Sequence, residues 1–201
     1  MNCVDLNAAS RDLLPPDCAV CTWWQPQTAG AAQAASRPVW EAQVEAEAGM
    51  FGRALLDGAA MVGWMQTAPA ALARRDLPTG PPSADSYLLA CAFLYDEQFL
   101  PGFQVLLQDV VAALKLRRVV ALEAYALRDP SPDDRFTGYL RELNLFNANV
   151  LEGWGFSRLR TAGHVGRYRL ELQTLVAAPR RSRAAEKTAE KTKAEPATIP
   201  A

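Results

Sequence analysis

The sequence has one histidine, four cysteines and no apolar stretch approaching the roughly 20 residues that cross a bilayer. These shortages argue against a membrane-spanning helix and against a zinc site built on paired histidines. The first residues, Met1 to Asp5, lack the basic region and apolar core of a signal peptide. We therefore expect a cytoplasmic protein whose cysteines are thiols.

An excess of charge of either sign is also lacking, because 21 Lys and Arg stand against 22 Asp and Glu. Residues 180–201 hold six basic and three acidic residues, which leaves fifteen basic and nineteen acidic residues in the rest of the chain. A mildly acidic body offers no broad basic face to a nucleic-acid backbone. Nucleic-acid binding is therefore not expected, except as weak contact through the tail.

The chain of 201 residues, half of them hydrophobic, can bury one core of ordinary size. From Pro179 onward the composition changes to Arg, Ala, Glu, Lys and Pro, and Ile199 is the one large apolar residue. Such a segment has too little apolar surface to fold. We predict one domain over residues 1–178 and a disordered tail over residues 179–201.

The pattern of apolar residues predicts alternating helices and strands. A helix ends at Gly49, and Asp57-Gly58 marks the turn of an antiparallel hairpin. The nearly continuous apolar run 86–95 suits a strand buried on both faces, and one helix separates it from a second such strand at 119–125. That order predicts a parallel crossover. The other expected elements are hairpin strands 53–56 and 61–67, helix 101–116, a helix ending at Gly153, and strands 158–161 and 168–175.

This order, along roughly residues 1–177, resembles the GNAT superfamily of acetyl-CoA-dependent N-acetyltransferases. The segment 54–64, with Asp57-Gly58 and Val62-Gly63, is similar to the second and third strands of that family. Asn144 followed by the segment 151–156 is similar to the ending of its last helix. The resemblance implies an α/β fold: a mixed, twisted sheet of about six to seven strands in one domain, with helices on both faces. The sheet would splay between the strand ending at Tyr95 and the strand beginning near Val119.

The resemblance places the pyrophosphate loop of CoA between the central strand and the next helix. Backbone N–H groups and a helix N-terminus stabilise an anion at such a loop, which requires small residues. Gln98 matches the family pattern, but Pro101 and Phe103 take the two glycine positions. Proline supplies no N–H, and a ring at 103 would fill space meant for phosphate. Acetyl-CoA binding is therefore expected to be weak or lost; the candidate cofactor residues are Gln98, Gly102, Phe103, Gln104, Val105 and Asn144.

The family often uses a tyrosine of the last helix to protonate the departing thiolate, and here Leu151 takes that position. Tyr139 or Tyr125 could replace it, although either ring could simply lie at the edge of the core. Glu123, on the strand after the CoA helix, is a candidate base. It could instead point outward as a surface charge.

Cys18 and Cys21 have the spacing of a metal or redox pair, but the sequence offers no second pair to complete a zinc site. We expect no metal and predict thiols packed near Trp23 and Trp24. His164 is more typical of a loop or strand edge than of a base.

Taken together, these features predict an acetyl-CoA-dependent N-acetyltransferase that acts on a small-molecule or protein amine. The alternative is a GNAT-like binding or regulatory protein that does not turn over acetyl-CoA. Either form could dimerise through its sheet edges.

Overall fold

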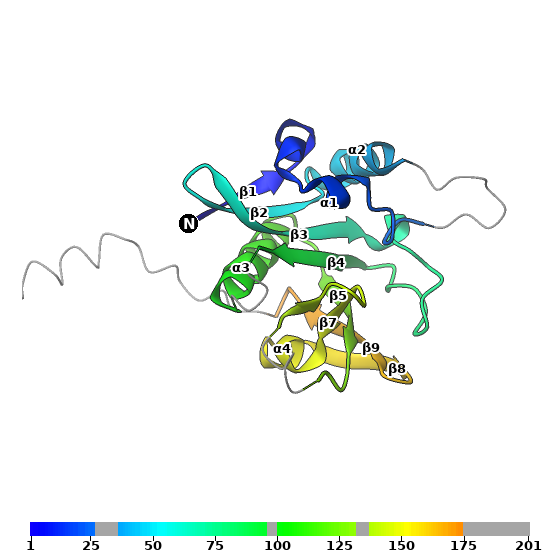
Figure 1. Ribbon diagram of the computed structural model, residues 1–201. Helices are drawn as coiled ribbons and strands as arrows, with labels where there is room; N and C mark the ends of the chain where they lie inside the picture. Colours follow the sequence, from blue (N-terminus) through cyan, green and yellow to red (C-terminus); the bar gives the residue numbers. More distant parts are fainter. Residues whose placement is uncertain (27–35, 96–99, 132–136, 175–201) are drawn as a thin grey trace, which may run out of the picture.

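The computed structural model describes residues 1–26, 36–95, 100–131 and 137–174, and its strands form one mixed sheet. Four strands pair in antiparallel order across the upper part of Figure 1: β1 (Asn2–Leu6), β2 (Gly52–Asp57), β3 (Ala60–Pro69) and β4 (Ser86–Leu94). The predicted hairpin around Asp57-Gly58 is the β2–β3 pair, and Gly58 has the positive φ of 60° that its turn requires. The predicted central strand is β4.

Helices cover both faces of this half of the sheet. On one face α2 (Arg37–Ala48) packs Trp40 and Val44 against Trp64 of β3. On the other face α3 (Leu100–Leu116) packs Leu106 against Met65, the next residue of β3, because successive side chains of a strand point to opposite faces. The short elements η1 (Ala8–Leu13), α1 (Pro16–Val20) and η2 (Ala70–Leu72) complete the face that carries α2.

The second half of the sheet is built on β5 (Ala121–Leu127). Its first residues pair with β4 in parallel, as the single intervening helix predicts. One edge of β5 pairs along its whole length with β9 (Val165–Glu171), which in turn pairs with β8 (Ser157–Ala162). The end of β5 pairs with β7 (Leu145–Asn147), the partner of β6 (Tyr139–Leu140) in a small hairpin. Helix α4 (Ala148–Gly153) follows β7 and packs Leu151 into the core beside α3.

The mixed, twisted sheet with helices on both faces in one unit confirms the α/β fold that the GNAT resemblance implied (Figure 1). The described residues form nine strands rather than six to seven. The additional strands are β1, a short edge strand, and the hairpin β6–β7, both of which form through pairing with distant residues. The described part contains no helix long and apolar enough to span a membrane. The predicted domain boundary after residue 178 and the predicted tail, residues 179–201, lie outside the described residues.

Candidate functional site

The candidate site is the opening where β4 and β5 part. The two strands pair only from Ser86 and Ala121 to Leu88 and Glu123, and β4 then continues alone on that side to Leu94. Within this stretch the pairing of β4 with β3 skips one residue, so that Ala90 forms a bulge. Bulges interrupt the regular ladder and re-aim the groups around them. The splay that the family resemblance implied is therefore present, with an irregular β4 along one side.

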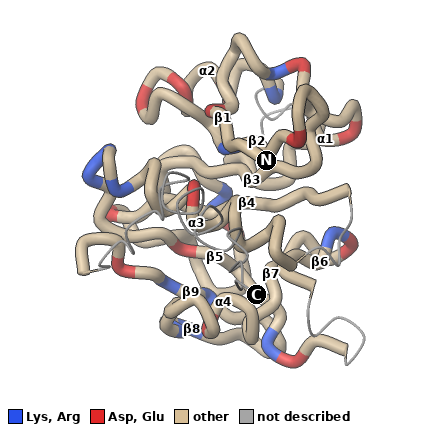
Figure 2. The backbone as a smooth tube through the Cα atoms, turned by 90° about the vertical axis from the view of Figure 1, so that its left-hand side faces the viewer, with Lys and Arg blue, Asp and Glu red and all other residues tan. Residues whose placement is uncertain are grey.

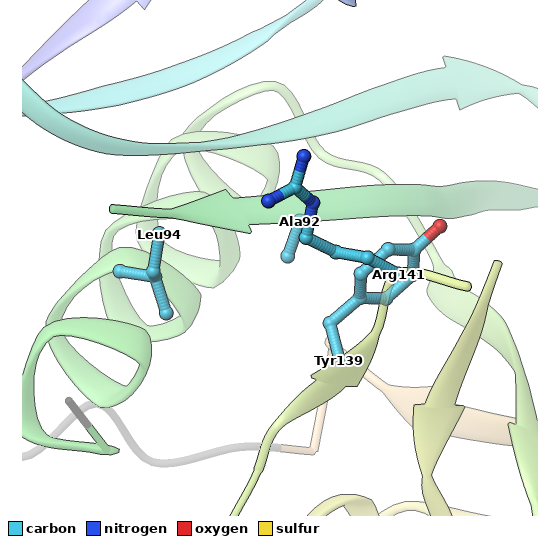
Figure 3. Close-up of a pocket in the computed structure, with 4 residues that line it drawn as sticks. All are labelled: Ala92, Leu94, Tyr139 and Arg141. Atoms are coloured by element: carbon cyan, nitrogen blue, oxygen red, sulfur yellow. The ribbon is translucent and has the colours of Figure 1, made fainter. Parts of the chain in front are cut away.

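The hairpin β6–β7 lies in this opening, because β7 pairs with the end of β5 and Tyr139 of β6 lies beside Ala92 of β4 (Figure 3). A strand has two edges, and β9 takes one edge of β5 throughout, so β4 and β7 share the other. Tyr139 and Arg141, from β6 and its turn, lie against Ala92 and Leu94 of β4. The pocket that these four residues line has a volume of about 10 Å³, which is room for about one water molecule.

Phe103 lies beneath the hairpin and is fully buried. Its ring packs against Phe146 of β7, with ring centroids 6.2 Å apart, and Phe146 in turn meets Tyr139 at 4.8 Å. A Cβ added to Gly138 would overlap the Phe103 ring, so the hairpin approaches α3 as closely as glycine allows. Apolar burial thus places Phe103 in the core between α3 and the hairpin, and its effect on a bound phosphate stays a prediction.

The other predicted cofactor residues are spread over two elements. Gly102, Gln104 and Val105 belong to the first turns of α3, with Gly102 buried and the other two exposed, and Gln98 lies outside the described residues. Asn144 is in the β6–β7 turn with a positive φ of 53°, rather than in a helix. Its side-chain oxygen accepts a hydrogen bond of 3.4 Å from the Tyr139 hydroxyl.

Tyr139 is the phenol that the structure places at the opening. Its side chain is buried, and desolvation raises its pKa well above the ordinary value of tyrosine. A phenol in this state keeps its proton at neutral pH. Tyr125 stacks on Trp24, whose side chain also lies near Tyr139, and donates a hydrogen bond of 2.7 Å to the carbonyl oxygen of Gly80.

Glu123 is completely buried rather than pointing outward. One carboxylate oxygen lies 3.1 Å from a guanidinium nitrogen of Arg169, and the other lies 3.6 Å from Arg167 and accepts a hydrogen bond from the backbone N–H of Ser83. The charged segments of β5 and β9 run side by side (Figure 2). These arginines lie more than 40 residues away in the sequence and were not predicted as partners of Glu123. The only available signal was the alternation of Arg169 with apolar residues in the predicted strand 168–175.

The structure does not bring Glu123 and Tyr139 together. Glu123 is opposite Leu88, where β4 and β5 still pair, whereas Tyr139 lies against Ala92 and Leu94. The four residues from Leu88 to Ala92 correspond to roughly 13 Å along a strand. Glu123 as a base and Tyr139 as a proton donor would therefore act at two separate places.

All four cysteines are free thiols, and the described residues contain no group of three or more His, Cys, Asp or Glu that could hold a metal ion. Burial raises the pKa of Cys18 and of Cys91. His164 is exposed near the β8–β9 turn, 3.5 Å from Asp129.

No family model matches the chain, and no curated protein matches it. Solved structures similar to it include the ribosomal-protein-S18-alanine N-acetyltransferase from Escherichia coli, with 12% identity over 89% of this chain and 97% of that chain and a TM-score of 0.49. A GNAT-like decarboxylase, GphF, in complex with isobutyryl-CoA has 18% identity over 86% and 100% of the two chains and a TM-score of 0.48. An N-acetyltransferase from Staphylococcus aureus Mu50 has 10% identity over 86% and 99% and a TM-score of 0.47. At these identities no residue role is carried over to this chain.

Proposed function

We propose that the protein is a GNAT-type N-acetyltransferase that takes acetyl-CoA at the opening between β4 and β5 and acts on a small-molecule or protein amine. The observation that carries this proposal is the parting of two parallel strands, which leaves Leu89–Leu94 of β4 without β5 as a neighbour. The pantetheine arm of CoA is an extended chain with amide groups. Such a chain can bind along a strand edge by main-chain hydrogen bonds.

The described residues leave little free space in the opening beside Tyr139. The hairpin β6–β7 stands where the arm would lie, and the pocket left beside Tyr139 has room for about one water molecule. Glu123 as a base and Tyr139 as a proton donor therefore stay predictions from the sequence, as does dimerisation through the sheet edges.

The second candidate is a GNAT-like binding or regulatory protein that does not turn over acetyl-CoA. The buried contact of Phe103 with Phe146 and Gly138 favours it, because this contact holds the hairpin in the opening. Leu151 favours it as well, since it is fully buried at the position where the family resemblance places a proton donor.

An assay for the release of free CoA from acetyl-CoA distinguishes the two candidate functions. It uses millimolar acetyl-CoA and a panel of polyamines, amino acids and peptides with free N-termini. Amine-dependent release supports the acetyltransferase. Acetyl-CoA binding without release under every condition supports the regulatory protein. If acetyl-CoA neither binds nor reacts, the opening is not an acyl-CoA site and the proposed function is wrong.

A further inference from the structure

The edge of β5 that faces the opening has two successive neighbours. Over its first three residues the neighbour is β4, and at Ala126 and Leu127 it is β7. The hairpin thus takes the place beside β5 that β4 gives up. Because the pairing with β7 spans only two residue pairs, backbone hydrogen bonds contribute little to keeping the hairpin there.

Side chains hold the hairpin instead. Phe146 is fully buried between Phe103 and Tyr139. On the opposite side, the guanidinium group of Arg141 lies 4.6 Å from the centre of the Phe93 ring on β4, which is a cation–π contact. The hairpin is therefore anchored both to the helix beneath the opening and to the strand that forms its side.

These anchors belong to a short hairpin, whose last residue, Asn147, is also the N-cap of α4. Moving the hairpin out of the opening would break only its two residue pairs with β5, because β4 and β9 each pair with other residues or the other edge of β5. Opening the hairpin costs the burial of Phe146 and Tyr139, so the form with the hairpin in place is the more populated one. With the hairpin moved out, the opening between β4 and β5 would be free.

We propose that the hairpin β6–β7 is an internal plug of the acyl-CoA opening, and that acetyl-CoA binds only to molecules in which the plug has moved out. This inference rests on the proposed function, since it names the opening as the acyl-CoA site. It explains why the pocket beside Tyr139, between the parted strands, has room for only about one water molecule. The apparent affinity for acetyl-CoA is the intrinsic affinity reduced by the fraction of open molecules.

The test compares acetyl-CoA binding by calorimetry in the full-length wild-type protein and in variants that loosen the plug. Arg141→Ala removes the exposed anchor on Phe93 and should leave the fold intact. Gly138→Ala pushes the hairpin away from Phe103. Both variants should bind acetyl-CoA at least tenfold more tightly than the wild type. The matched control is Arg74→Ala, which removes a similar cation–π contact outside the hairpin, 4.4 Å from the Trp23 ring centre, and should leave binding unchanged.

Amide hydrogen exchange supplies the second readout. Exchange at Phe146 and Asn147 should accelerate in both variants and, on addition of acetyl-CoA, in the wild type as well. If the wild type binds acetyl-CoA as tightly as the variants do and keeps these amides protected, the hairpin is not a plug. The proposed function is unaffected by that result. If exchange shows that the hairpin is released and no form binds acetyl-CoA, the opening is not an acyl-CoA site. The proposal that the hairpin is a plug is then wrong as well.

Discussion

Replacing Glu123 by Gln should strongly destabilise the protein. The carboxylate is fully buried and faces two guanidinium groups, at 3.1 Å for Arg169 and 3.6 Å for Arg167, whose side chains are 13% and 10% exposed. Arg169 keeps Asp85 and Glu171 as partners, so the change mainly leaves Arg167 without its carboxylate. Breaking a buried ion pair by removing one partner costs about 3–5 kcal/mol, and we expect a loss at the lower end of this range in the free energy of unfolding.

Glu171→Gln is the matched control because Glu171 pairs with the same Arg169 at 2.5 Å but is 52% exposed. Exposed ion pairs contribute about 0–1 kcal/mol, so this change should barely alter stability. Urea unfolding followed by circular dichroism measures both variants, with equal slopes indicating the same unfolded state. Equal losses for the two variants would refute the argument that burial sets the contribution of Glu123. The same pair tests the predicted base, since catalysis by Glu123 requires that the folded fraction of Glu123→Gln be inactive while Glu171→Gln is active.

Three further predictions follow from the site and the sequence. Gly138→Ala should lower the free energy of unfolding by about 1–3 kcal/mol, because the added Cβ overlaps the Phe103 ring. Gly153→Ala is the control, since nothing lies near its added Cβ, and urea unfolding of both variants measures the difference. Protein purified without chelator should contain no stoichiometric zinc by elemental analysis, and finding zinc would contradict the assignment of Cys18 and Cys21 as thiols. A chain ending at residue 178 should have the same melting temperature as the full chain, measured by differential scanning fluorimetry, and a clear drop would show that the tail packs.

Local signals in the sequence were sufficient for the elements that form the centre of the fold. The turn at Asp57-Gly58, the apolar run of β4 and the helical spacing of α3 each depend on neighbouring residues. They therefore predicted the hairpin, the central strand and the parallel crossover, and the structure confirms them. The splay between β4 and β5 came from the family resemblance and is also confirmed.

The hairpin β6–β7 could not be predicted in the same way. Its strands have two and three residues, and the apolar side chains between Tyr139 and Phe146 suit a helix as well as a strand. Only the pairing with β5 and the contact with Phe103 decide between them, and both partners lie far away in the sequence. The burial of Phe103 and the charge partners of Glu123 depend on tertiary contacts for the same reason.

The pairing of β5 with β9 also fixes the order in which the chain can fold during synthesis. Strands β1 to β4 pair only with one another until β5 is made, so the antiparallel half can form while the remainder is still being translated. The outer edge of β5 stays uncovered until Val165–Glu171 leaves the ribosome, about 40 residues later. A buried strand with an exposed edge is prone to pair with another chain. The interval between the synthesis of β5 and that of β9 is therefore when the nascent protein is most open to aggregation.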